Sequence, residues 1–248
     1  MGITAMIIVT ITTISIATHM STATMTDIPN SAPADHMTNT MDLLTLTQWM
    51  SPAFPLGAFA YSHALELAIA EKAVTDADSL EVWVSDTLKF GGGKVDAALL
   101  AMVLAGEDIG TVSDLAESLA GTRERWMETF EQGSAFVRTV SQMGGAEIAP
   151  CALPVAVGQA ARTLNLPNET VISLYLHSFA ANLVSAAVRF VPLGQSAGQR
   201  VLAQLHATIK AQSSAAIGAT IESLNTSGFA ADLNAARHED MDVRLFKS

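Results

Sequence analysis

The sequence predicts an all-α fold, a single-domain helical bundle with short connections between its helices. From Leu43 onward, apolar residues recur at three- and four-residue spacing, which is the period of a helix. Half of the 248 residues are hydrophobic, which is enough to fill the core of one large domain. No stretch shows the alternation of apolar and polar residues that is typical of β-hairpins.

The first forty residues differ from the rest of the chain. They contain no Lys or Arg and are rich in Thr, Met, Ser and Ile. We interpret residues 1–40 as a disordered or mispredicted leader, with translation starting as late as Met25, Met37 or Met41, and residues 41–248 as the domain. The alternative is an export or anchoring segment. The apolar run is shorter than the about 20 residues of a spanning helix and lacks the cationic start of a secretory signal.

The clearest helical pattern covers residues 171–190, whose apolar stripe must be buried against neighbouring helices. Pro167 precedes this segment and Pro192 follows it, where proline is tolerated before a helix and where it ends one. A second long segment, 112–143, ends at a pair of glycines. The other predicted helices cover residues 61–72, 78–90, 94–104, 153–164 and 196–221.

Three breaks separate these segments. Residues 51–57 contain two prolines and a glycine, residues 91–93 are all glycine, and residues 225–228 form the third break. None is long or polar enough to link independently folding domains. We therefore expect one domain.

The charge and cysteine content exclude several classes of protein. The chain carries 13 basic and 24 acidic residues, a net charge of −11, with an isoelectric point near 4.8. Affinity for nucleic acids depends on Lys and Arg at the phosphates, so we expect no nucleic-acid partner. Cys151 is the only cysteine, which excludes an internal disulfide and indicates a reducing cytoplasm. We also expect no membrane partner.

Motifs that carry chemistry are missing. The run Gly91-Gly92-Gly93-Lys94 lacks the preceding glycine and the following hydroxyl residue of a phosphate-binding loop. The six histidines are scattered and nowhere form the i, i+4 pair of a helical metal site. Cys151 has no basic activator nearby in the sequence, so we expect an inert thiol. The sequence thus predicts no catalytic, cofactor-binding or metal-binding residue.

Two stretches could meet other proteins. Five charged residues on the long central segment predict a solvated face with weak ion pairs, or else a partner surface; they are Arg123, Glu124, Arg125, Glu128 and Glu131. In the other stretch, a turn fixed by prolines and Gly57 is followed by Phe59, Tyr61 and Glu66. Aromatic side chains are enriched at binding hot spots, so this turn suits recognition, although it could equally be an ordinary entry into the core.

Four segments, in colinear order, resemble the urease accessory protein UreF family over about residues 43–248. The first is Ser51-Pro-Ala-Phe-Pro-Leu-Gly-Ala-Phe-Ala-Tyr-Ser-His-Ala-Leu-Glu66. The second is Thr122-Arg-Glu-Arg, followed by Gln132-Gly133. The third runs from Asn182 to the turn Pro192-Leu-Gly-Gln and on to Gln199. The fourth is Arg237-His-Glu-Asp-Met-Asp-Val-Arg-Leu-Phe-Lys-Ser248.

The resemblance implies a function that the composition could not give. Proteins of this family are all-α dimers that bind the accessory protein UreD, also called UreH. That complex recruits the GTPase UreG, and the assembly delivers nickel to apo-urease. The resemblance implies a scaffold and regulator without a catalytic centre or directly bound cofactor, because nickel and GTP are handled by the complex.

The resemblance also implies partner-binding residues. Phe59, Glu66, Asp96 and Arg189 match places implicated in contact with the GTPase or in the fidelity of activation, and Tyr61 stands beside Phe59 in the same signature. We expect the first four to form a UreG-facing patch and Tyr61 to contribute to partner binding. Three residues of the C-terminal segment are expected to dock on UreD; they are Arg244, Leu245 and Phe246.

The sequence departs from the family pattern at two places and leaves two alternative functions open. Ala64 stands where the family usually has glycine, and residues 240–243 differ from the usual polar, often aromatic stretch. A metal- or small-molecule-dependent helical enzyme could use Glu66, Asp96 or His238 as acid, base or ligand. A membrane-associated helical protein is a third possibility.

Overall fold

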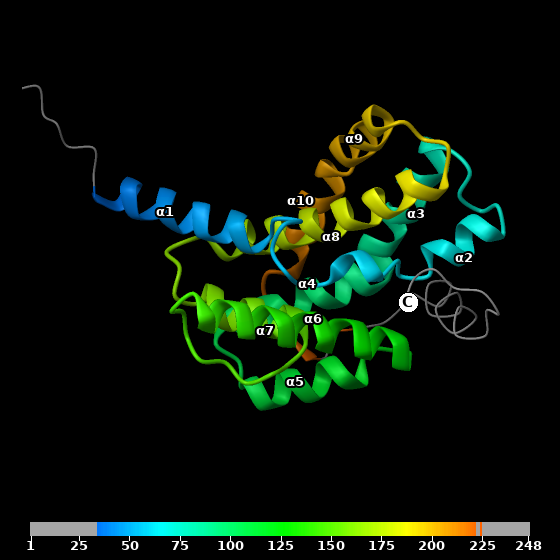
Figure 1. Cartoon of the computed structure of the whole chain (residues 1–248). Coiled ribbons are helices and arrows are strands. Elements are labelled where there is room, and N and C mark those ends of the chain that lie inside the picture. The colour runs from blue at the N-terminus through cyan, green and yellow to red at the C-terminus, as the bar shows by residue number, and fades with distance from the viewer. Residues whose placement is uncertain (1–33, 222–223, 225–248) are drawn as a thin grey trace, which may run out of the picture.

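The computed structural model describes residues 34–221 and residue 224. Every regular element among these residues is a helix, which confirms the all-α prediction (Figure 1). The helices are α1 (Ala34–Trp49), a short 3-10 helix η1 (Ala58–Ala60), α2 (Leu65–Ala70), α3 (Ala77–Phe90), α4 (Gly92–Ala105), α5 (Ile109–Ser118), α6 (Arg123–Gln142), α7 (Leu153–Ala161), α8 (Asn168–Phe190), α9 (Gln195–Gln204) and α10 (His206–Ala216).

Helices α4 and α8 form the centre of the bundle. Helix α4 packs against α3, α5, α7, α8 and α10, and α8 packs against α3, α9 and α10 as well. Leu100 and Val103 of α4 and Leu176 and Leu183 of α8 are fully buried. Each such side chain contributes about 1.5–3 kcal/mol on burial, so this contact is a main source of the stability of the fold.

Helix α8 is also long and apolar enough, by length and composition, to cross a membrane. Half of its most apolar window is buried inside the bundle. Core helices of soluble proteins share these properties. The neighbouring helices α3, α4, α9 and α10 account for its apolar face.

Helix α1 extends from the side of the bundle (Figure 1) and begins within the range predicted as leader. The predicted boundary at residue 41 therefore falls inside a helix, while residues 1–33 lie outside the described residues. The second half of α1 is anchored to the bundle: Leu46 is fully buried, and the carboxylate of Asp42 accepts a hydrogen bond from the amide of Asn165 at 2.8 Å. There Trp49 packs edge-on against the buried ring of Phe136 of α6, with 5.6 Å between the ring centroids.

Three predicted helix boundaries are wrong. The segment 112–143 is two helices, because Gly121 has a φ of +74° and Thr122 caps α6 by accepting a hydrogen bond from the amide of Arg125. The segment 196–221 is likewise divided into α9 and α10 at Leu205. The segment 61–72 contains only the short α2, which ends near Lys72, a residue with positive φ.

Candidate partner-binding surface

The turn that the sequence singled out lies along α8 and is held there by two hydrogen bonds. The side-chain amide of Asn182 donates to the carbonyl of Ala58 at 3.0 Å, and the hydroxyl of Ser178 donates to the carbonyl of Met50 at 2.9 Å. Gly57, at the centre of the turn, has a φ of +74°, which other residues adopt only with strain. The first and third family-like segments, far apart in the sequence, therefore meet at one surface.

Phe59 and Arg189 form the exposed part of this surface, which we call the Phe59–Arg189 patch. Phe59 is 47% exposed. The guanidinium carbon of Arg189, in the last turn of α8, lies 5.2 Å from the centre of the Phe59 ring. This is a cation–π contact, which contributes about 0.5–1 kcal/mol at an exposed site. The contact orients both side chains and leaves the outer face of the pair open to a partner.

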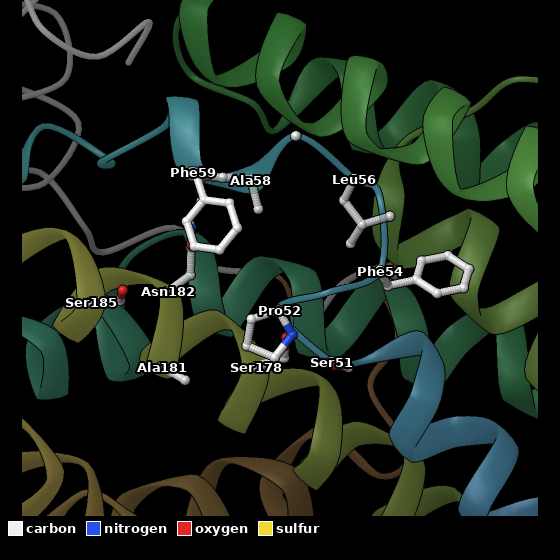
Figure 2. Close-up of a pocket in the computed structure, with 11 residues that line it drawn as sticks. Ser51, Pro52, Phe54, Leu56, Ala58, Phe59, Ser178, Ala181, Asn182 and Ser185 are labelled. Atoms are coloured by element: carbon white, nitrogen blue, oxygen red, sulfur yellow. Dashed lines mark hydrogen bonds between the residues drawn. The ribbon is translucent and has the colours of Figure 1, made fainter.

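A shallow pocket lies next to the patch, between the turn and α8 (Figure 2). Leu56 and Pro52 are turned toward it, whereas the ring of Phe54 points away and packs on Phe136, with 5.7 Å between the ring centroids. No ionisable side chain lines this pocket, so it suits an apolar side chain of another protein better than a charged cofactor. Its lining consists of Ser51, Pro52, Phe54, Leu56, Gly57, Ala58, Phe59, Ser178, Ala181, Asn182 and Ser185.

Tyr61 and Glu66 follow the patch in the chain but differ in exposure. Tyr61 is buried, and its hydroxyl donates a hydrogen bond to a carboxylate oxygen of Glu131 on α6. Burial, followed by this carboxylate, raises the pKa of Tyr61 well above its usual value. Glu66 is half-buried in the first turn of α2. Tyr61 thus joins the turn to α6 from the inside and is not part of the exposed surface.

Asp96, which we expected in a UreG-facing patch, is only 4% exposed and lies inside the bundle. One terminal nitrogen of Arg125 on α6 donates to both of its carboxylate oxygens at 2.7 Å. The hydroxyl of Tyr175 on α8 donates to the same carboxylate at 2.7 Å. Asp96 therefore joins α4, α6 and α8, so a direct contact with a partner would require the bundle to open.

The same buried network continues along α6. Glu128 is 1% exposed; one of its carboxylate oxygens lies 2.9 Å from Nε2 of His63 and accepts a hydrogen bond from the side-chain amide of Gln132 at 3.1 Å. Its other oxygen lies 3.6 Å from Arg125. We call this set the Arg125 cluster; its members are His63, Asp96, Arg125, Glu128, Gln132 and Tyr175.

The electrostatics of the Arg125 cluster are those of a structural network. Desolvation lowers the pKa of Arg125, but the carboxylates of Asp96 and Glu128 outweigh it and raise that pKa above its ordinary value. Burial, followed by Asp96, raises the pKa of Tyr175. The guanidinium therefore stays charged and the phenol stays neutral. Removing one partner of such a buried pair costs about 3–5 kcal/mol, because the other charge is left uncompensated.

The prediction of a solvated charged face on this helix is wrong for two of its five residues. Glu128 and Arg125 point into the bundle, whereas Arg123 and Glu131 are exposed. The sequence contains a pattern that indicates the burial of Arg125 and Glu128, because they share a helical face with Gln132 and Phe136, which are buried. His63 and Tyr175 had no such signal, since only the packing of distant segments brings them to the cluster.

Two of the three residues proposed for an enzyme lie among the described residues, on different helices. Glu66 lies on α2, whereas Asp96 lies on α4 with both of its oxygens hydrogen-bonded. His238 lies outside the described residues, as do Arg244, Leu245 and Phe246. Within residues 34–221, no group of three or more His, Cys, Asp or Glu side chains is placed to hold a metal ion.

Comparison with known proteins agrees with the four segments. The model of the family UreF matches residues 74–206, which span α3 to α9. The urease accessory protein UreF of Cereibacter sphaeroides strain ATCC 17025 is 54% identical over 206 residues, which are 83% of this chain and 98% of that protein. Those of Paracoccus denitrificans strain Pd 1222 and Jannaschia sp. strain CCS1 are 45% and 44% identical, also over 83% of this chain and over 95% and 94% of their own lengths.

Proposed function

Because this chain belongs to the UreF family of urease accessory proteins, we propose that it acts as a scaffold and regulator of urease maturation. Together with UreD, also called UreH, it recruits the GTPase UreG, and the complex inserts nickel into apo-urease in a GTP-dependent step. The chain itself carries no catalytic centre. Nickel and GTP are handled by the complex.

The Phe59–Arg189 patch is the observation that supports this proposal most directly. Two segments that resemble the family meet there, and they place an aromatic ring and an arginine on an open surface. Tyr, Trp and Arg dominate binding hot spots, and a rigid aromatic contributes contact area at little cost in conformational entropy. The adjacent apolar pocket offers a place for a side chain of UreG. Glu66 adds a carboxylate on α2.

Coexpression with UreD and UreG tests the proposal. We expect the wild-type chain to form a complex with UreD that retains UreG, read out by size and mass. Phe59→Ala and Arg189→Ala should weaken UreG retention at least tenfold and leave UreD binding unchanged. Arg138→Ala, which changes an exposed arginine on α6, is the matched control and should bind like the wild type. A complex that forms equally well with all variants would remove the patch from the proposal, and no complex at all would remove the scaffold role.

The C-terminal segment makes a separate prediction about UreD. We propose that Arg244, Leu245 and Phe246 order against UreD, since a short apolar pair beside a cation can fold on docking. Deleting residues 244–248 should therefore weaken binding to UreD and leave the homodimer intact. If the dimer dissociated instead, this assignment would be wrong.

The state and place of action complete the proposal. We propose that the protein is a homodimer in the cytoplasm, with apo-urease as the final partner of the complex and without a nucleic-acid or membrane partner. A net charge of −11 supports the exclusion of nucleic acids. Light scattering of the purified chain should give twice the mass of 26.0 kDa. Turnover of a metabolite by the isolated chain would instead favour the enzyme hypothesis.

A further inference from the structure

Two histidines that are far apart in the sequence face each other where α8 meets α10. His177 lies in the middle of α8, and His206 is the first residue of α10. The centroids of their rings are 5.5 Å apart, and the ring planes are inclined by 44°. Among the described residues, neither ring has a hydrogen-bond or ion-pair partner, unlike His63, which is bound to Glu128.

The fold holds the two rings in this position. One turn before His177, the hydroxyl of Ser173 donates to that of Ser213 on α10 at 2.8 Å. Ile209, one turn after His206, is buried in the core. His177 is partly exposed and His206 is exposed, so solvent and dissolved ions can reach the pair. The site needs little rearrangement, because its two helices are already fixed.

The separation of the rings suits a shared metal ion. A first-row metal binds an imidazole nitrogen at about 2.0–2.1 Å, and two imidazoles in tetrahedral or trigonal positions then have centroids about 5–5.5 Å apart. The measured 5.5 Å lies at the upper end of that range. The inclination of 44° departs from the parallel arrangement of stacked rings.

A neutral imidazole is the form that binds a metal, and it does so through the lone pair of a ring nitrogen.

We propose that His177 and His206 together bind one first-row divalent cation that prefers imidazole ligands, such as Ni²⁺ or Zn²⁺. No third His, Cys, Asp or Glu among the described residues completes the site, so water or a donor from another protein occupies the remaining positions. Two protein ligands give a site of modest affinity from which the ion exchanges readily. This inference does not depend on the proposed recruitment of UreG, since the isolated chain is sufficient to test it.

Calorimetric titration of the full-length, chelator-treated chain with NiSO₄, ZnCl₂ or MgCl₂ tests the site. The variants His206→Gln and His177→Gln and the double variant measure how much metal binds at other places on the chain. We expect each single variant to lower the affinity for Ni²⁺ or Zn²⁺ at least tenfold. The double variant should lose little more than either single variant, because both rings bind the same ion. Mg²⁺, which prefers oxygen ligands, should not bind at this site.

Two control variants decide between this site and others. Lys210→Ala removes a cation one turn from His206 without removing a ligand, so the affinity should stay equal or increase. His238→Ala removes the histidine that precedes Glu239 and Asp240 and should leave the site intact. The proposal is overturned if His206→Gln binds like the wild type, if His238→Ala abolishes binding, or if the losses from the two single variants add up in the double variant. Circular dichroism should show unchanged helicity for His206→Gln, whose side chain is exposed.

Discussion

The Arg125 cluster and the Phe59–Arg189 patch both centre on an arginine, but the two arginines have opposite surroundings. Arg125 is paired with two carboxylates inside the bundle, while Arg189 lies over an exposed aromatic ring. A buried ion pair is costly to break, whereas an exposed cation–π pair contributes only about 0.5–1 kcal/mol to folding. Family-like segments thus supply residues of two kinds: some hold the helices together, and others leave a surface for a partner.

The largest expected effect comes from the close contact of α6 with α7 beside the buried cluster. A Cβ atom on Gly133 would lie 2.0 Å from the carbonyl oxygen of Cys151, which is backbone and cannot give way cheaply. We expect Gly133→Ala to lower the free energy of unfolding by about 3 kcal/mol or more. Gly194→Ala is the control, because nothing lies within 4 Å of its added methyl group. Equal urea midpoints for the two variants would contradict the tight contact.

Asp96→Ala should be about as damaging as Gly133→Ala. It leaves Arg125 buried without its main partner, so we expect a loss of about 3–5 kcal/mol. Asp86→Ala, at an exposed position of α3, should change stability by no more than about 0.5 kcal/mol. In the double variant with Arg125→Met, the total loss should be smaller than the sum of the single losses. A stable Asp96→Ala variant that fails only to bind UreG would instead return Asp96 to the partner surface.

The buried region should also respond to alkaline pH. Burial raises the pKa of Cys151 to about 11, although a hydrogen bond from Gln159 partly opposes this shift. Above pH 9 the thiol ionises in the unfolded chain but not in the folded one, so the unfolded state binds fewer protons and stability falls as pH rises. We expect Cys151→Ala to remove about 1–2 kcal/mol of the loss between pH 9 and pH 11. Parallel pH profiles for variant and wild type would contradict this assignment.

Between the two regions, Ala64 occupies a strained position. Its φ of +61° is in the left-handed region, which explains why glycine is usual there. An L-residue in this region lowers the free energy of unfolding by about 1–2 kcal/mol, whereas burial of the methyl group raises it by about 0.8 kcal/mol. Ala64→Gly should therefore raise the free energy of unfolding by about 0.5–1 kcal/mol in urea denaturation. A decrease would show that methyl packing outweighs backbone strain.

The smallest effects on stability should be at the surface. Arg189→Ala should lower the free energy of unfolding by no more than about 1 kcal/mol, the contribution of its cation–π contact, and Glu66→Ala should change it by no more than about 0.5 kcal/mol. Their effect should appear in UreG recruitment or in the fidelity of nickel insertion. A large loss of thermal stability in either variant would assign that residue to the fold and reduce the contrast between the two regions.

Some candidate positions can be predicted from the sequence because they depend on local chemistry. Prolines and Gly57 predict the turn, and the aromatic residue that follows them predicts a recognition surface. The contact between Phe59 and Arg189 was not readable in this way. The contact forms only because the turn around residue 59 packs against the end of α8. The two residues are too far apart in the sequence for a local pattern to predict that they meet.

The helical class, the single domain and the family can all be predicted from the amino-acid sequence, because helical periodicity and motif residues are properties of short stretches of chain. Which charged residues are buried depends instead on how the helices pack. Asp96 and Arg125 are charged residues of the kind usually found at a protein surface. The packing of α4, α6 and α8 removes them from water and makes each the partner of the other. The pair His177 and His206 was decided in the same way, since helix packing and not sequence spacing brings their rings together.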